Sequence, residues 1–222
     1  MNNLKDITKH LFYSAWILTI IQMIRVAAVT IIAVDFPEMV LIADVAFDCA
    51  LILFGIGLIR LGKELDNYTK WLIAPVFLFT AAGLDIINII FSWSSFREEW
   101  SSYPLAYLNL TILVIYVISL VTGFLFLKFD IDKLVKNGYI ERKGQYFLAL
   151  GFLVNIVSQI IGWYGGFIGV SSTQIWLENL ALYDYLFASF LIILGFFGLA
   201  STMKLLQNWS DHQELDEFSE GE

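Results

Sequence analysis

The sequence predicts an all-α polytopic membrane protein with six transmembrane helices, and three observations lead to this fold class. Of the 222 residues, 59% are hydrophobic and only 15% are charged, whereas roughly a quarter of the residues in a soluble domain carry a charge. Six apolar stretches are each long enough to cross a bilayer core, which takes roughly 20 residues of helix. Almost all Lys and Arg residues lie in alternate connections between these stretches.

The six apolar stretches are expected to be helices, because lipid cannot satisfy an open backbone edge and the alternating pattern of barrel strands is absent from the sequence. The first stretch is too long for a signal peptide and contains Arg25, so we expect a retained helix. The last is longer than a membrane requires and should extend into water. In chain order the predicted spans are Leu11–Ala33, Met39–Leu61, Trp71–Ser92, Leu105–Leu127, Gln145–Ile168 and Leu180–Leu206.

The connections between spans are short, and the chain ends in an acidic stretch, residues 207–222, that we expect to be a solvated cytoplasmic tail. In the longest internal connection, Lys128–Gly144, Ile131 and Leu134 stand at helical spacing ahead of Gly138. A helical extension of the fourth span explains this spacing better than a docking module. The three successive hairpins also carry polar residues at similar offsets, which either an internal triplication or a shared need for polar groups at one depth would produce.

The basic residues are divided unevenly between the two sides of the predicted bundle. Eleven lie on one side and only Arg97 lies on the other, with Arg25 inside the first span. Because basic connections stay in the cytoplasm, this division predicts an integral, multi-pass membrane protein with both termini cytoplasmic. The eleven are Lys5, Lys9, Arg60, Lys63, Lys70, Lys128, Lys133, Lys136, Arg142, Lys143 and Lys204.

Nine polar or charged side chains inside the predicted spans are the candidate ligand-binding or ion-binding residues. An ionised side chain at the bilayer centre costs at least about 2.5–3.5 kcal/mol, so such residues normally face protein or water. Eight of the nine form pairs three or four residues apart, which places each pair on one helix face and favours a common interior. The set consists of Gln22 and Arg25, Asp44 and Asp48, Asp85 and Asn88, Asn155 and Gln159, and Asp184.

The charged members of this set are expected at similar depths. At about 1.5 Å per residue, Asp48, Asp85 and Arg25 lie about 10–13 Å from the outer ends of their spans, so the polar layer should be reached from outside. One Arg faces four Asp, and by depth Arg25 should pair with Asp48 or Asp85. The remaining carboxylates then require protons, water or a bound cation.

Structural readings of the same residues stay open. Arg25 and one Asp could form an ion pair that only holds helices together. Asp44 and Asp184 lie near enough to the outer interface to be hydrated without a function. The amides of Asn88, Asn155 and Gln159 are more often interhelical hydrogen-bonding groups than ligand contacts.

Four glycines at overlapping four-residue spacing mark the outer end of the fifth span. This spacing lets two helices approach closely. Packing within the chain is the first interpretation, and a contact between two copies of the chain is the alternative. The glycines are Gly162, Gly165, Gly166 and Gly169.

Several classes of chemistry are disfavoured by the residues present. The two histidines, His10 and His212, lie near the chain ends, so we expect neither haem nor a His-ligated metal within the bundle. The sequence has no P-loop and no HExxH or GxSxG motif, and no cofactor is predicted. Paired aspartates also serve intramembrane hydrolases, but no accompanying motif supports that activity, and an enzyme is the less favoured class. No feature indicates nucleic-acid binding.

Two functional hypotheses from different classes follow. The first is a small transporter, channel or ligand-binding subunit whose outward-facing acidic cavity binds protons, a cation or a cationic ligand. The second is a non-catalytic structural or regulatory subunit of a larger membrane complex, with lipid, other membrane subunits or a second copy as partners. A vitamin-capturing subunit of an ABC-type importer would have similar size and spacing, but the chain has no motif specific to one.

Overall fold

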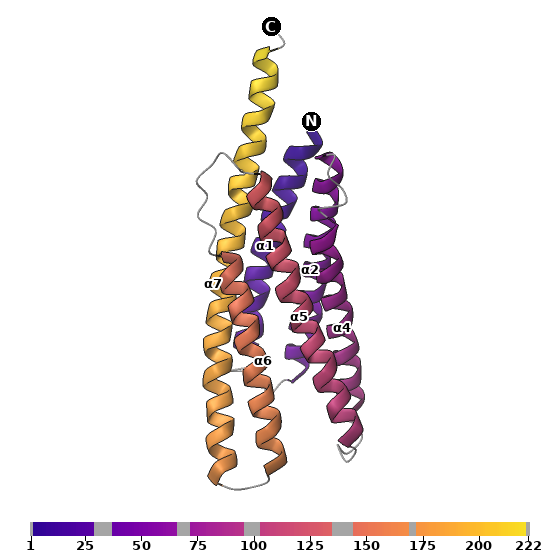
Figure 1. The fold of residues 1–222 in the computed structure, drawn as a ribbon, viewed down its shortest axis with the longest axis vertical. Helices are drawn as coiled ribbons and strands as arrows, with labels where there is room; N and C mark the ends of the chain where they lie inside the picture. The colour runs from indigo at the N-terminus through magenta and orange to yellow at the C-terminus, as the bar shows by residue number, and fades with distance from the viewer. Residues whose placement is uncertain are drawn as a thin grey trace.

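A computed structural model of the chain describes residues 2–28, 37–65, 72–95, 103–134, 144–168 and 172–220, and the regular secondary structure in these ranges is helical. The all-α prediction is confirmed for this part of the chain. Figure 1 shows the helices running side by side in an elongated bundle. They are α1 (Asn2–Ala27), α2 (Pro37–Glu64), α4 (Ile73–Ser95), α5 (Tyr103–Leu134), α6 (Gly144–Ile168) and α7 (Ser172–Glu220).

Four helices are long and apolar enough to cross a membrane. The qualifying segments are Leu4–Ala27, Met39–Glu64, Ile73–Ile90 and Leu180–Asn208. The apolar segments found in α5 and α6 are shorter, Thr111–Leu127 and Tyr146–Ser158, although these helices have 32 and 25 residues in full. The chain is therefore a membrane protein by the length and composition of at least four helices.

The helices form a closed ring in chain order. Backbone contacts join α1 to α2, α2 to α4, α4 to α5, α5 to α6 and α6 to α7, and α7 closes the ring against α1. Consecutive helices are antiparallel, so α1 begins and α7 ends at the same end of the bundle (Figure 1). We call this the basic end, because Lys5, Lys9, Arg60, Lys63 and Lys204 lie there, and we call the other the opposite end. The 49-residue α7 projects past the other helices at the basic end.

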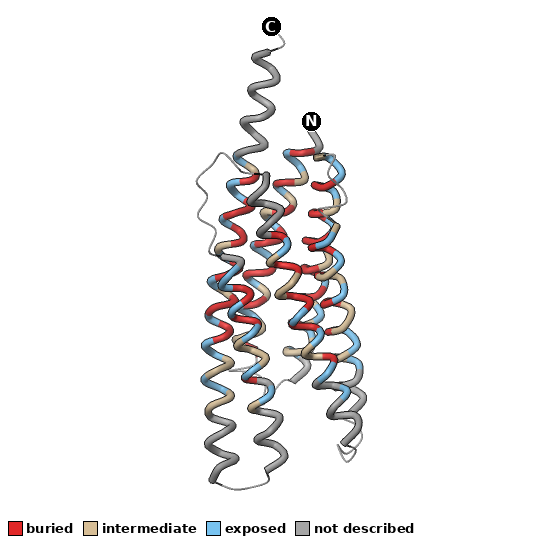
Figure 2. The backbone as a smooth tube through the Cα atoms, in the orientation of Figure 1, coloured by how far each residue is buried: buried red, intermediate tan, exposed pale blue. Residues whose placement is uncertain are grey.

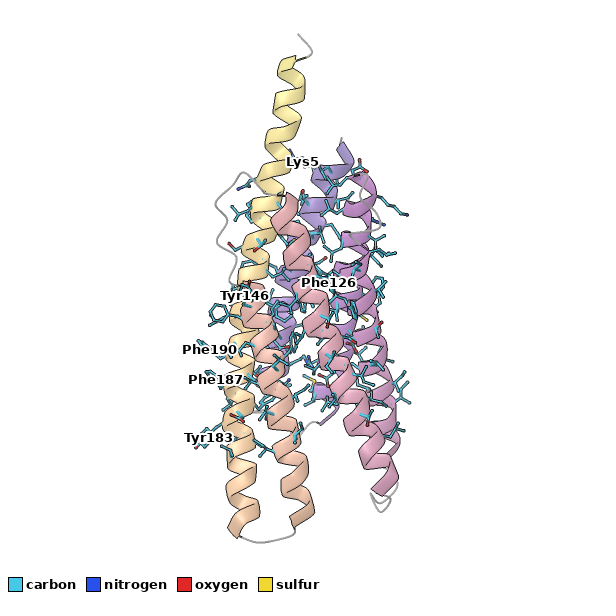
Figure 3. All side chains as sticks on the ribbon, viewed as in Figure 1. Lys5, Phe126, Tyr146, Tyr183, Phe187 and Phe190 are labelled. Atoms are coloured by element: carbon cyan, nitrogen blue, oxygen red, sulfur yellow. The ribbon has the colours of Figure 1, made fainter. Side chains whose placement is uncertain are left out.

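The surface of the bundle is apolar, as expected for helices surrounded by lipid. On α7, Tyr183, Phe187 and Phe190 are 70%, 55% and 57% exposed, and Figure 3 shows all three pointing away from the bundle. Buried positions lie on the inner faces of the helices (Figure 2). A continuous apolar exterior of this kind is rare on soluble monomers.

Two glycines allow α6 and α7 to pack with their backbones almost in contact. A Cβ atom on Gly195 would lie 2.6 Å from the backbone nitrogen of Leu148, and one on Gly151 would lie 2.9 Å from that of Ile192. Ser158 also donates a 2.6 Å hydrogen bond from α6 to the carbonyl oxygen of Ala181 on α7. Small residues therefore set this helix pair, as membrane helix packing often requires.

The predicted glycine stripe is not the one that makes these contacts. Gly162, Gly165 and Gly166 lie on α6, in a part where the structure describes the backbone only, and Gly169 lies outside the described residues. Their packing role therefore stays a prediction.

Several predicted boundaries differ from the observed helices. The predicted first span ran to Ala33, but α1 ends at Ala27, and residues 29–36 lie outside the described part. Arg25 consequently occupies the last turn of α1. At the basic end, α5 continues to Leu134, as its spacing predicted, and α7 continues to Glu220 through most of the predicted tail. Gly138, the expected end of the α5 extension, is outside the described residues.

Candidate functional site

The centre of the candidate site is an ion pair between the first two helices. The Nε atom of Arg25, in the last turn of α1, donates a 2.6 Å hydrogen bond to Oδ1 of Asp44 on α2. The two side chains are only 19% and 23% exposed. The prediction that Arg25 pairs with Asp48 or Asp85 is therefore wrong, because Arg25 lies nearer the end of its helix than the predicted span implied.

Two further contacts hold the Arg25 guanidinium in place. Its Nη1 atom donates a weak 3.5 Å hydrogen bond to Oε1 of Gln22, one turn earlier on the same helix. Its Cζ atom lies 4.6 Å from the ring centroid of Phe47 on α2, within the range of a cation–π interaction. Gln22 therefore shares a helix face with Arg25, as the three-residue spacing predicted, and its role in ligand binding stays a prediction.

Two other carboxylates are buried beside this pair without comparable partners. Asp48 has no exposed surface, and neither of its carboxyl oxygens has a hydrogen-bond partner in the described structure. Asp85 on α4 is 6% exposed; it interacts with the Asn88 side chain, but its Oδ2 atom is also unpartnered. A buried carboxylate in this situation is costly, since it has lost water without gaining a hydrogen-bond partner for each of its oxygens.

The unpartnered buried side-chain atoms in the described residues share one chemical property. All of them are oxygens of carboxyl or carboxamide groups, namely Asp48 Oδ1, Asp48 Oδ2, Asp85 Oδ2, Asn88 Oδ1 and Asn155 Oδ1. Each of these oxygens accepts hydrogen bonds or binds a cation when the carboxyl groups are ionised. What the site lacks is therefore a donor or a positive charge.

Four charged groups and two tyrosines interact electrostatically within this region. Asp48 interacts electrostatically with Asp85, Arg25 and Asp44. The buried hydroxyl of Tyr116 on α5 interacts with these three groups and with Asp48. Tyr185 on α7 interacts electrostatically with Arg25 and Asp44, and its hydroxyl shares a hydrogen bond with the Ser189 side chain. Neither tyrosine was predicted from the sequence, because in an apolar run a tyrosine has the same pattern as any aromatic core residue.

An aromatic cluster borders the polar site. Phe196 of α7 has ring centroids of three other phenylalanines around it, at 5.9 Å (Phe47), 5.9 Å (Phe124) and 6.5 Å (Phe152). Phe124 and Phe152 are themselves stacked at 6.1 Å. We call these four residues the Phe quartet; they come from α2, α5, α6 and α7 and are at most 2% exposed. The quartet therefore fills the middle of the helix ring.

The remaining predicted site residues are not brought into the cluster by a described contact. Asp184 is partly buried on α7, next to Tyr185. The side chain of Gln159 is outside the described structure, so its predicted role is untested. Asn155 lies one turn beyond Phe152 on α6, which places it on the same helix face as the quartet.

A separate groove lies at the basic end between α1 and α2. It has a volume of about 520 Å³ and carries charges of both signs. His10 lines it and contacts the carbonyl oxygen of Leu53 at 3.3 Å. Its mixed charge gives no preference for an anion or a cation. The lining residues are Asp6, Ile7, His10, Gly57, Arg60, Lys63 and Glu64.

Within the described residues, no three His, Cys, Asp or Glu side chains are placed to hold a metal ion together. Comparisons of the chain with protein-family models, with curated proteins and with solved structures give no match.

Proposed function

We propose that this chain is a membrane protein that binds a positively charged ligand, a proton or a cation, at Asp48 and Asp85. The observation that carries the proposal is the burial of Asp48, whose two carboxyl oxygens have no partner in the described structure. Arg25 is already engaged by Asp44 at 2.6 Å. The cluster therefore contains three carboxyl groups and one guanidinium, and a charge imbalance of this size in an apolar bundle needs compensation.

The oxygen-only character of the unpartnered atoms defines the ligand class. A proton on either carboxyl group would remove its charge and supply a donor to a neighbouring oxygen. A metal cation would instead be bound by oxygen ligands, and a protonated amine would donate to them. An anion or a neutral acceptor would find no partner among these unpartnered atoms, because all of them are oxygens.

Equilibrium binding with the purified chain in lipid nanodiscs tests the proposal. Thermal unfolding is measured with added sodium, potassium, calcium, magnesium or an alkylammonium salt, with choline at matched ionic strength as the reference. A ligand at 100 times its Kd stabilises the folded state by about 2.7 kcal/mol. We expect one cation to do so in the wild type and in Asp184→Asn, the matched control, but not in Asp48→Asn.

Stabilisation that survives in both Asp48→Asn and Asp85→Asn would place the binding site elsewhere. If no cation stabilises the chain, the remaining ligand is a proton. Infrared spectroscopy of the Asp48 and Asp85 carboxyl groups then tests whether one of them is protonated.

We further propose six membrane crossings with both termini in the cytoplasm. This arrangement is supported by the eleven-to-one distribution of basic residues, the closed ring of helices and the shared end at which α1 begins and α7 ends. Protease digestion of intact and inverted membrane vesicles tests it. Loss of the α7 extension only in inverted vesicles is expected, and loss in intact vesicles would reverse the orientation.

A role as a subunit of a larger membrane complex is the second candidate. It is favoured by α7, which has 49 residues where roughly 20 suffice to cross a bilayer. Its last 14 residues after Leu206 would reach about 21 Å beyond the membrane. Truncation after Gln207 should shift the native complex to lower mass if this helix binds a partner subunit, and an unchanged mass argues against that role.

A further inference from the structure

The polar site and the Phe quartet divide the interior of the bundle into two unlike halves. On α5, Tyr116 precedes Phe124 by eight residues, and on α6, Asn155 follows Phe152 by three. Because α5 runs toward the basic end and α6 runs away from it, both polar residues lie on the opposite-end side of the quartet. On α2, Asp44 lies one turn to that side of Phe47, and Asp48 is level with Phe47.

The half toward the basic end has an apolar interior. From Phe47 the inner face of α2 continues through Leu51, Phe54, Leu58 and Leu61, none of which has any exposed surface. The 14 residue steps from Phe47 to Leu61 span about 21 Å. The facing part of α7 is similar, with Leu199, Ala200, Met203 and Leu206 buried.

The buried polar groups described in this apolar half are hydroxyls, and charged residues there lie at the surface. Thr8 and Thr202 donate to carbonyl oxygens of their own helices, Lys5 and Gly198. Lys5, Lys63 and Lys204 are exposed. An ion moving from Asp48 toward the basic end would therefore lose its oxygen ligands. The free-energy cost of a charge without ligands in an apolar interior of this length is prohibitive.

The other side of Asp48 is closed by a polar contact of a different kind. Asp44 lies one turn toward the opposite end on the same face of α2, and it holds Arg25. That ion pair keeps about a fifth of its surface exposed. This contact is polar and partly exposed, whereas the quartet is a layer of packed rings at most 2% exposed.

We propose that the Phe quartet is the closed floor of the site, so that the ligand of Asp48 and Asp85 enters and leaves only from the opposite end, past the Arg25–Asp44 pair. This inference rests on the proposed function and adds its direction of access. In this conformation the chain binds its ligand and does not conduct it. Passage to the basic end requires the quartet to separate.

The Arg25 guanidinium contacts both the entry side of the site and the Phe quartet. It bonds Asp44 on the entry side and lies 4.6 Å over the ring of Phe47, a member of the quartet. Phe47 in turn contacts Phe196, which contacts the other two rings. The same guanidinium therefore contacts both the entry side of the site and its floor.

Cysteine accessibility from the two sides tests the floor. The native Cys49 is replaced by Ser, and Ser189→Cys supplies a nearly isosteric probe, two turns from Phe196 on the opposite-end side of α7 and in contact with Tyr185. A membrane-impermeant, positively charged thiol reagent is applied to intact and to inverted vesicles. A Lys9→Cys marker at the basic end identifies which preparation exposes that end.

We expect the Ser189→Cys probe to react at least tenfold faster from the opposite end than from the basic end. Phe196→Ala should raise the rate from the basic end at least tenfold, whereas Phe190→Ala, an exposed position on the same helix, should leave it unchanged. If Phe196→Ala does not give a monodisperse protein, Phe196→Leu takes its place, with an expected rise of at least threefold.

Reaction that is no faster from the opposite end, including no reaction from either end, overturns the proposal. A folded Phe196 variant without any rise from the basic end does so as well. The labelling is carried out without added cation, so a failure of the binding experiment and a failure of this one are distinguishable.

Discussion

Replacing Arg25 and replacing Asp44 should have unequal effects on stability, although the two residues form one ion pair. In the wild type, one guanidinium faces Asp44, Asp48 and Asp85, a formal balance of one positive and three negative charges. Arg25→Gln removes the positive charge and leaves three carboxyl groups. Asp44→Asn removes one negative charge and leaves Arg25 beside the two remaining carboxyl groups. The first variant should therefore be the less stable.

The expected magnitudes follow from the burial of the pair. Removing one partner of a fully buried pair costs about 3–5 kcal/mol, and the exposed fractions of 19% and 23% favour the lower end. Arg25→Gln should therefore cost about 3 kcal/mol. Asp44→Asn should cost only about 1.5–2 kcal/mol, the lower end of the range for a hydrogen bond to a charged group, because Arg25 stays beside two other carboxyl groups. For a chain of this size, these costs correspond to Tm decreases of about 6–12 °C and about 3–8 °C.

Intrinsic tryptophan fluorescence during heating of the chain in nanodiscs measures these shifts. The double variant Arg25→Gln/Asp44→Asn is the most informative control, because it removes the unpaired Asp44 charge that Arg25→Gln leaves behind. Its Tm should lie above that of Arg25→Gln alone, so the interaction free energy between the two substitutions should exceed the cost of Asp44→Asn, about 1.5–2 kcal/mol. Equal effects of the two single variants, or a double variant with the sum of both losses, would refute the charge argument.

Three other substitutions, with Gly83→Ala as a control, test the packing around the site. Gly195→Ala should destabilise the chain by at least about 2 kcal/mol, because its Cβ would meet the backbone of α6, whereas Gly83→Ala, with open space at this position, should be neutral or stabilising by up to about 1 kcal/mol. Ser158→Ala should cost about 1 kcal/mol, the value of its hydrogen bond to α7. Phe124→Ala should cost about 3–5 kcal/mol through the cavity it leaves in the quartet. Chemical unfolding of each variant measures all of these differences, and a Gly195→Ala variant as stable as Gly83→Ala would contradict the close packing.

The helical fold could be predicted because its signal is local. Each long apolar run of this chain forms most of a helix, and no information about neighbours is needed to see it. The extensions of α5 and α7 beyond the apolar runs were also predicted. For α5 the signal was Ile131 and Leu134 at helical spacing, and for α7 it was the excess length of the last span. In both cases the observed helix continues the predicted one.

The membership of the site was predictable in part, and its pairing was not. The spacing of Gln22 with Arg25 and of Asp44 with Asp48 correctly placed each pair on one face. The partner of Arg25 was misassigned because its depth was counted from a helix end at Ala33, whereas α1 ends at Ala27. A shift of a few residues at a helix end is enough to exchange Asp48 for Asp44, which lies one turn away.

The Phe quartet had no signal in the sequence. Its four members come from four helices, and in each helix they stand among other apolar residues with the same pattern. Only the closed ring of α1, α2, α4, α5, α6 and α7 brings them together. The same holds for Gly151 and Gly195, whose importance depends on where α6 and α7 approach each other.

The central claim is that positive charge other than Arg25 compensates Asp48 and Asp85, and the protonation state of these two carboxyl groups tests it most directly. Infrared difference spectroscopy detects the carbonyl band of a protonated carboxyl group, and native mass spectrometry and elemental analysis of the same sample detect a bound cation. We expect either a carboxyl band that weakens in Asp48→Asn or Asp85→Asn, or a cation bound in stoichiometric amount and lost in these variants. Two ionised carboxylates with no bound cation would contradict the account.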